Sequence, residues 1–208
     1  MNITPTEEYK DIAKKIGVPH LYLKREDMHP LGSHKGRSIP VMIDAYIGEG
    51  FKKFSISSSG NAAIAAGTYI QKLNTLKPKK ILLDIYIGKN ISPEKKKTIL
   101  NLADEYIKVS EKERPLQAFL ESMKLSDVKG LRQSTDDVAL VGYVSLAQEL
   151  LEIPNLSAVF VATSSGTTAE ALGEYFIKNK KNVAIYIVQT SSCHPIAEIF
   201  DKGAVSDE

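Results

Sequence analysis

The sequence contains one cysteine, Cys193, and carries a formal net charge of only +2. A single cysteine excludes an internal disulfide bond and suits a reducing compartment. A small net charge gives no strong attraction to nucleic acid or to an anionic membrane. No apolar run is long enough to span a bilayer, and residues 1–15 lack the apolar core of a signal peptide. The composition therefore predicts a cytoplasmic protein with neither a nucleic-acid nor a membrane partner.

Histidine is also scarce, and its distribution does not suggest a metal site. The four histidines, His20, His29, His34 and His194, lack metal-ligand spacing, such as two on one face of a helix. Cys193 is best interpreted as a small buried residue rather than as a nucleophile or a metal ligand. We therefore expect no bound metal.

The chain has 208 residues, of which 43% are apolar and 25% charged, as in ordinary globular proteins. Predicted strands alternate with predicted helices along it. The strands are at residues 21–24, 53–57, 81–87, 106–109, 158–163 and 183–188. The helices are at residues 35–48 (interrupted early by Pro40), 60–73, 92–103, 116–123, 136–151, 167–178 and 195–201. This alternation predicts an α/β fold with parallel sheet and flanking helices.

Residues 32–37, Gly-Ser-His-Lys-Gly-Arg, form the first segment that indicates chemistry, and Lys24-Arg25-Glu26 precedes them. Lys35 follows a loop directly and stands in the first turn of an apolar helix, which is unusual for a solvated charge. A buried lysine amine tends to lose its proton and becomes nucleophilic toward an aldehyde. An ordinary surface lysine at a helix start fits this one residue equally well.

A second segment, residues 57–63, lies where a predicted strand ends and a predicted helix begins. Backbone N–H groups at a helix start favour an anion, and the side chains of Ser58, Ser59 and Asn61 add donors. Taken alone, this segment fits helix capping by serine or asparagine better than it fits a binding site.

The third segment, residues 163–168, again lies between a predicted strand and a predicted helix. Its backbone donors, its hydroxyls and the single Gly166 suit a phosphate group. No lysine follows the glycine as in a Walker loop, and the three glycines of a dinucleotide fingerprint are missing. In an open α/β sheet such loops gather at the carboxyl ends of the strands, so both anion loops belong there.

An amine nucleophile, a carboxylate-sized site and a phosphate-sized site, in this order, resemble the pyridoxal-phosphate enzymes of the tryptophan-synthase β type (fold type II). Threonine synthase, threonine dehydratase and cysteine synthase belong to this family. Residues 32–37 are similar to its Gly-Ser-x-Lys-x-Arg motif, and residues 58–61 to its Ser/Thr-Ser-Gly-Asn loop. Residues 164–168 stand where the family has its phosphate loop, in a more serine-rich form. The resemblance covers roughly residues 21–200.

The resemblance implies a cofactor, pyridoxal 5′-phosphate, and a role for each motif. Lys35 would be the catalytic residue, forming a Schiff base with the cofactor and moving protons at the substrate α-carbon. His34 would touch the phosphate or only line the pocket. Asn61 would bind the cofactor's ring hydroxyl, and Ser58, Ser59 and Gly60 the substrate carboxylate. The phosphate would lie on Ser164, Ser165, Gly166, Thr167 and Thr168.

The resemblance also implies the domain organisation: two interleaved subdomains, a smaller one at residues 38–134 and a larger one formed by residues 1–37 with 135–208. The family commonly continues well past Cys193, so we expect the larger subdomain to be incomplete. Two residues depart from the family pattern. Gly36 stands where many relatives have aspartate, and His29 replaces a frequent asparagine before Pro30.

The activity that the resemblance implies is β- or γ-elimination or replacement on a small amino acid. Residues 137–149 and 188–200, with Gln189 among them, favour a threonine-synthase-like lyase of amino-acid metabolism. Two alternatives stay open: a non-catalytic protein that binds the cofactor or an amino acid, and a fragment or split subunit that needs a complementing chain. A homodimer is expected on family grounds.

Overall fold

The computed structural model describes residues 3–76 and 78–200 of the chain. The chain forms two compact units, Met1–Arg132 and Gln133–Glu208, which we call the N-terminal and the C-terminal unit. Within the described residues, none of the helices has the length and apolar character needed to cross a membrane. The last residue of the predicted helix at 195–201 lies outside the described residues.

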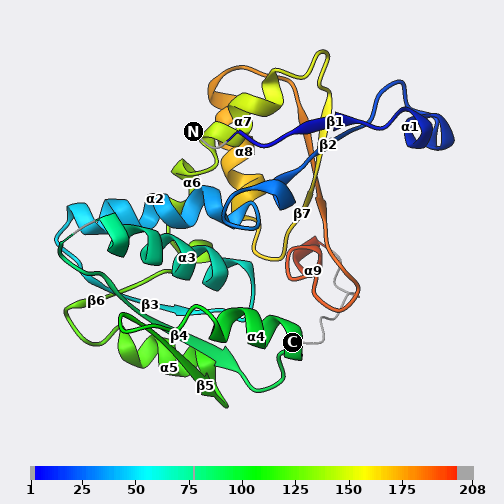
Figure 1. The fold of residues 1–208 in the computed structure, drawn as a ribbon. Coiled ribbons are helices and arrows are strands. Elements are labelled where there is room, and N and C mark those ends of the chain that lie inside the picture. The colour runs from blue at the N-terminus through cyan, green and yellow to red at the C-terminus, as the bar shows by residue number, and fades with distance from the viewer. Residues whose placement is uncertain (1–2, 77, 201–208) are drawn as a thin grey trace. The chain divides into compact units, whose positions relative to one another are not determined.

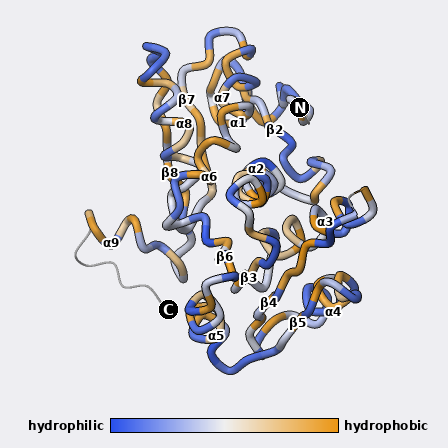
Figure 2. Tube along the Cα trace, turned by 90° about the vertical axis from the view of Figure 1, so that its left-hand side faces the viewer, coloured by the Kyte–Doolittle hydropathy of each residue, from blue (hydrophilic) through white to orange (hydrophobic). Residues whose placement is uncertain are grey.

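A parallel sheet of four strands forms the centre of the N-terminal unit (Figure 1). Its strand order is β5-β4-β3-β6, with β3 at Lys53–Ser57, β4 at Leu82–Gly88, β5 at Ile107–Lys112 and β6 at Val128–Gly130. Phe54 is paired with Leu83 and Ile56 with Ile85, and all four side chains are buried. Figure 2 shows how strongly apolar β4 is. Strands of this kind are typical of a parallel sheet covered on both faces.

Helices cover both faces of this sheet. These helices are α2 (Lys35–Gly48), α3 (Asn61–Leu76), α4 (Pro93–Leu100) and α5 (Pro115–Ser122). Helix α3 lies on one face with α2 packed against it, and α5 covers the opposite face (Figure 1). Small residues permit these contacts: a Cβ atom at Gly67 would overlap Leu102, and one at Gly130 would overlap Phe119 and Met123. Close packing thus explains two of the glycines.

The N-terminal segment adds short elements. Strands β1 (Thr6–Glu8) and β2 (Tyr22–Lys24) form an antiparallel pair, and helix α1 (Lys10–Ile16) lies in the segment that connects them. The 3₁₀ helix η1 (Glu26–Met28) follows β2. Only β2 of these is predicted from sequence. A strand of only three residues, such as β1 or β6, is too short to show an alternating pattern.

The C-terminal unit is a strand–helix–strand layer with helices. Strands β7 (Ala158–Ala162) and β8 (Ala184–Val188) pair in parallel, and helix α8 (Thr167–Lys178) connects them. The remaining elements are η2 (Gln133–Thr135), α6 (Val138–Val141), α7 (Val144–Leu151) and α9 (Ala197–Phe200). Helix α8 packs against α6 and α7, with Leu172, Phe176, Tyr143 and Leu146 in the core.

The predicted fold class, α/β with parallel sheet and flanking helices, is confirmed. Three details differ. Helix α2 continues through Pro40, which removes one hydrogen bond to the Gly36 carbonyl without ending the helix. The predicted helix at 136–151 is divided into α6 and α7 around Gly142, and α4 ends at Leu100. The assignment of residues 1–37 to one subdomain with residues from 135 onward stays a prediction.

Candidate functional site

Lys35 is the first residue of α2, as the sequence predicts. The loop before it turns at Gly32, whose φ of 82° is a backbone conformation that glycine adopts at little cost. The Ser33 hydroxyl accepts a hydrogen bond from the Lys35 backbone N–H at 3.3 Å, and the Ser33 side chain is buried. Glycine and serine of the motif therefore shape the turn that begins the helix.

The electrostatic environment of Lys35 favours the neutral amine. Burial lowers the pKa of Lys35. Within the described residues its ammonium group forms no ion pair that would oppose this shift. Burial, and then the charge of Lys35, lowers the pKa of His34 to about 4, while Glu26 acts in the opposite direction. Near neutral pH, His34 is therefore uncharged, and the Lys35 amine loses its proton more readily than an exposed lysine does.

A buried ion pair anchors the same turn of α2. Arg37 Nε and Nη2 each donate to one oxygen of Glu26 at 2.7 Å, and Nη2 also donates to the Thr4 hydroxyl at 3.0 Å. Burial raises the pKa of Glu26, but the hydrogen bonds from Arg37 and Thr4 and the Arg37 charge lower it below its usual value overall. Bidentate pairing of this kind fixes both orientation and charge. The sequence analysis assigned no role to Glu26 or Arg37. An arginine inside an apolar helix could have indicated a buried ion pair.

The two departures from the family pattern form one packing feature. A Cβ atom at Gly36 would overlap the ring of His29 and the side chain of Leu31. The ring is buried, and its Nδ1 accepts a hydrogen bond from the Leu31 N–H at 3.1 Å. His29 therefore occupies the space that any side chain at position 36 needs.

The loop of Ser58, Ser59 and Gly60 connects β3 with α3, and Asn61 begins the helix. The Ser58 N–H donates to the Tyr86 carbonyl at 3.2 Å, so the loop lies beside the carboxyl end of β4. The Ser58 hydroxyl accepts from the Gly60 N–H, and the Ser59 hydroxyl from the Gly88 N–H, each at 3.3 Å. An accepting hydroxyl keeps its own hydrogen for donation, so both serines retain a donor for an anion.

The loop of Ser164, Ser165 and Gly166 connects β7 with α8. Gly166, with φ 85°, precedes the helix, and its N–H donates to the Thr163 hydroxyl at 3.0 Å. Ser164 and Ser165 are exposed, whereas Thr167 and Thr168 are buried. The loop thus presents serine hydroxyls and the N-terminal turn of a helix of 12 residues, where backbone N–H groups favour an anion.

The Thr167 hydroxyl is already engaged inside the C-terminal unit. It lies 3.1 Å from the Ser165 hydroxyl and donates to the Gln133 carbonyl at 3.4 Å. In the predicted phosphate site, Thr167 is therefore expected to act through its backbone N–H more than through its hydroxyl.

Lys35 and residues 58–61 belong to the N-terminal unit, where α2 and α3 pack against each other. Residues 164–168 belong to the C-terminal unit. Each predicted motif lies at the strand–helix or loop–helix junction that the sequence indicates, while the assigned binding roles stay predictions. Among the residues that the structure describes, no group of three or more His, Cys, Asp or Glu side chains is arranged to hold a metal ion.

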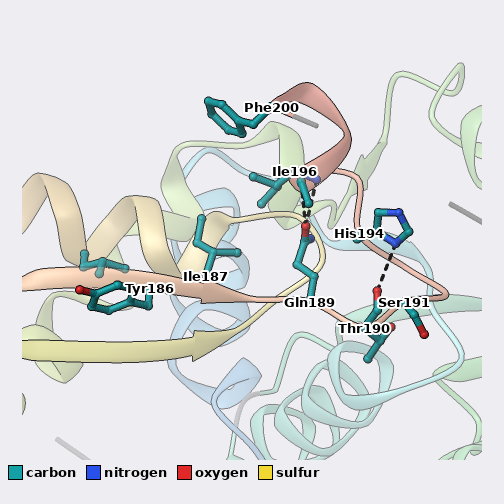
Figure 3. A pocket seen from close by; sticks show the side chains of 10 residues that line it. Tyr186, Ile187, Gln189, Thr190, Ser191, His194, Ile196 and Phe200 are labelled. Carbon is teal, nitrogen blue, oxygen red and sulfur yellow. Dashed lines mark hydrogen bonds between the residues drawn. The ribbon is translucent and has the colours of Figure 1, made fainter. Parts of the chain in front are cut away.

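A cavity of about 810 Å³ lies in the C-terminal unit, between β8 and α9 (Figure 3). None of the predicted site residues lines it. Its walls are Ile185, Tyr186, Ile187, Gln189, Thr190, Ser191, His194, Ile196, Ala197 and Phe200.

Comparison with known proteins gives both a family match and a relative. The model of the family described as "Pyridoxal-phosphate dependent enzyme" matches residues 1–208. Threonine synthase from Methanosarcina acetivorans is 35% identical over 66 residues, which is 32% of this chain and 16% of that relative.

Solved structures share the fold. The holo form of diaminopropionate ammonia lyase from Escherichia coli matches with a TM-score of 0.83 at 17% identity, over 99% of this chain and 60% of that one. Threonine deaminase isoform 2 from Solanum lycopersicum matches with a TM-score of 0.75 at 22% identity, over 89% of this chain and 50% of that one. At these identities the likeness establishes the fold alone. The chain spans at most 60% of the length of either neighbour.

Proposed function

Because this chain belongs to the family of pyridoxal-phosphate dependent enzymes, we propose that it bonds pyridoxal 5′-phosphate through Lys35 and acts on a small amino acid. The cofactor follows from the family, whereas the attachment residue and the substrate are our proposal. The observation that carries it is the position of Lys35, an amine of lowered pKa in the first turn of a buried helix start.

The residues present fit each part of this cofactor. An aldehyde reacts with the neutral form of an amine, and burial lowers the pKa of Lys35 toward that form. A phosphate needs several donors, and Ser164, Ser165 and the backbone from Gly166 onward supply them at the start of α8. Asn61 offers an amide donor for the ring hydroxyl, and uncharged His34, next to Lys35 in sequence, can lie beside the cofactor without repelling the lysine.

The substrate is held by its carboxylate in this proposal. Ser58 and Ser59 use their hydroxyl oxygens as acceptors within the loop, so their hydrogens are available to a carboxylate. The start of α3 behind Gly60 adds backbone N–H groups. When bound, pyridoxal phosphate supplies an electron sink at the substrate α-carbon. In this proposal Lys35 moves the α-proton, and its lowered pKa makes the amine a readier proton acceptor than an exposed lysine.

For the reaction type we propose β- or γ-elimination or replacement, as in a threonine-synthase-like lyase of amino-acid metabolism in the cytoplasm. The stretch of 66 residues that is 35% identical to threonine synthase supports this choice. Threonine deaminase and diaminopropionate ammonia lyase are also named for small amino acids, which supports the proposed substrate class. Their names do not favour one leaving group.

We also propose that the active form includes further polypeptide, either a complementing chain or a second copy in a homodimer. The chain spans 60% or less of the length of the two neighbours described above. Strand β8 leaves Tyr186, Ile187 and Val188 exposed, which is unusual for a parallel strand. In the same proposal, residues 1–37 join residues from 135 onward in the larger subdomain, and residues 38–134 form the smaller one.

The short span also supports a second candidate, a protein that binds the cofactor or an amino acid without turnover. Release of ammonia, phosphate or a 2-keto acid from candidate amino acids separates the two. Cofactor binding with product release supports the lyase. Cofactor binding with no product from any of them, alone or with a complementing chain, supports the binding protein.

The test of cofactor attachment is reduction with borohydride after incubation with pyridoxal phosphate, followed by mass spectrometry of the peptides. We expect the wild-type chain to show a visible absorption band and to retain cofactor mass on Lys35. The variant Lys35→Ala loses both, and the control Lys10→Ala, at an exposed lysine, keeps both. Cofactor mass on other lysines in the wild-type chain, with none on Lys35, contradicts the proposal.

A further inference from the structure

Gln189 follows β8 directly and joins two segments that lie far apart in sequence. Its side-chain Nε2 donates to the Thr163 carbonyl at 3.1 Å and to the Ser164 carbonyl at 3.0 Å. Its Oε1 accepts from the backbone N–H groups of Ile196 at 3.1 Å and Ala197 at 3.0 Å. One amide therefore connects the start of the phosphate loop with the start of α9.

These four hydrogen bonds use the whole capacity of a carboxamide, which has two N–H donors and two acceptor lone pairs. A carboxylate at position 189 has no hydrogens for the two carbonyls, and an aliphatic side chain has neither donors nor acceptors. Among uncharged side chains of this length, only glutamine can make all four bonds. Figure 3 shows the side chain of Gln189 directed at the backbone beside Ile196.

A second contact, independent of the amide, joins the same two segments. Gly166 has φ 85°, and a Cβ atom added there would lie 3.2 Å from Cδ1 of Ile196. Ile196 therefore lies against the loop three residues beyond the Thr163 carbonyl. The segment of residues 189–197 holds the loop at both of its ends.

This segment has its own internal support. The Cys193 N–H donates to the Thr190 carbonyl at 3.2 Å, and His194 Nδ1 lies 3.2 Å from the same oxygen. This turn returns the chain so that Ile196 meets Gln189. Residues 189–197, which we call the clamp, thus form a closed turn rather than an extended strand that passes the loop.

We propose that Gln189 is a positioning residue that orients the backbone of residues 163–166 for the phosphate of the cofactor. The inference rests on the proposed function of that loop. Binding to a loop held in one conformation avoids the entropy cost of ordering it. Gln189 itself does not contact the phosphate in this proposal, since all of its polar hydrogens and lone pairs are engaged with the backbone.

The test compares two forms of the cofactor, pyridoxal 5′-phosphate and pyridoxal, which lacks the phosphate. For Gln189→Leu we expect the Kd of pyridoxal phosphate to rise about tenfold, because two hydrogen bonds of ordinary strength no longer hold the loop. The Kd of pyridoxal stays within about twofold of the wild-type value. The control is Gln148→Leu, the same change at an exposed position on α7 of the same unit, which leaves both constants unchanged.

The outcomes separate this inference from the proposed function. Equal binding of pyridoxal phosphate by wild type and Gln189→Leu overturns the inference, and so does an equal loss of both ligands, because that loss is general damage to the fold. A wild-type chain that binds neither ligand refutes the proposed function instead.

Hydrogen exchange measured without cofactor tests whether Gln189 holds the backbone of residues 163–166 in one conformation. We expect the backbone N–H of Gly166 and its neighbours to exchange faster in Gln189→Leu than in wild type or in Gln148→Leu. Unchanged exchange refutes the clamp. If Gln189→Leu does not fold, Gln189→Asn, whose shorter side chain cannot reach both segments, and Ile196→Ala replace it with the same expected result.

Discussion

At the residue scale, the turn that begins α2 depends on matched pairs of side chains. Arg37 is paired with Glu26 inside the unit, and the ring of His29 fills the space beside Gly36. Lys35 stands between His34 and Gly36 in sequence. A substitution that displaces the backbone of either neighbour therefore also displaces Lys35. The position of Lys35 thus depends on packing and pairing by its neighbours in the same turn.

The contact between His29 and Gly36 predicts that substitutions at the two positions depend on each other. We expect Gly36→Ala to lower the free energy of unfolding by about 1–3 kcal/mol, because its Cβ overlaps the His29 ring. The double variant His29→Ala/Gly36→Ala recovers part of this loss, with a coupling energy on the order of 1 kcal/mol. Urea unfolding of the two single variants and the double variant measures it.

The control for this cycle is Gly48→Ala at the end of the same helix, where a Cβ atom meets nothing within 4 Å. It should be neutral or slightly stabilising, since alanine favours a helix more than glycine does. Strict additivity of the changes at positions 29 and 36 would contradict the packing argument.

His34 predicts a pH dependence of stability. Its pKa in the folded chain is lowered to about 4, so between its ordinary value of 6.5 and 4 the unfolded chain binds a proton that the folded chain does not. The free energy of unfolding therefore falls as pH decreases through this window, by an amount on the order of 2 kcal/mol. Urea midpoints from pH 7 to pH 4 should decline more steeply in wild type than in His34→Gln. Parallel curves for the two proteins would refute this role of His34.

At the element scale, single polar side chains complete the connections between helices and strands. Asn74, near the end of α3, donates through Nδ2 to the Ile81 carbonyl at 2.9 Å and accepts through Oδ1 from the Ile81 N–H at 2.8 Å. In the C-terminal unit, the Gln189 amide likewise bonds the backbone, because it donates to two carbonyls of the loop before α8. Both amides satisfy backbone groups that no helix or strand partner reaches.

We expect Asn74→Ala to lower the free energy of unfolding by about 2–4 kcal/mol, because it leaves both backbone groups of Ile81 buried without partners. Asn101→Ala, at an exposed position after α4, should cost less than about 1 kcal/mol. Chemical denaturation of both variants tests this difference. Similar losses for the two would show that water replaces the Asn74 amide.

At the scale of the whole molecule, the paired strands β7 and β8 expose more apolar side chains than is usual for a parallel sheet covered on both faces. The rings of Phe160 and Tyr186 stack at 4.8 Å between their centroids, and both side chains are more than half exposed. Exposed apolar patches of this kind mark interaction surfaces. They lie on the two paired strands, which agrees with the proposal that further polypeptide covers this sheet.

We therefore expect the chain to self-associate as its concentration rises, unless a complementing chain is present. The double variant Phe160→Ser/Tyr186→Ser should shift the association to higher concentration without lowering the melting temperature, because both residues are exposed in the folded chain. Size-exclusion chromatography with light scattering measures this shift. The control is Ile3→Ser, at an exposed residue of the N-terminal unit. A wild-type chain that stays monomeric at high concentration would count against the proposed surface.

Much of the fold was predictable from local pattern. The apolar residues of β3 and β4 and the capping Ser92 before Pro93 predict their elements to within a few residues. Strands β1 and β6 were missed, because a strand of only three residues is too short to show a period. The three motif segments lie at the junctions expected of them, since a strand end followed by serine and glycine marks a turn locally.

By itself, the sequence determined the alternation of elements, because hydrophobic period is a property of neighbouring residues. Its motifs predicted the cofactor through their resemblance to a family, and the family match agrees with that prediction. Only the tertiary structure decided which distant residues support those motifs. Arg37 meets Glu26, His29 fills the space at Gly36, and Gln189 holds the loop of Ser164. These contacts join residues 7 to 25 positions apart, which become neighbours only when the chain has folded.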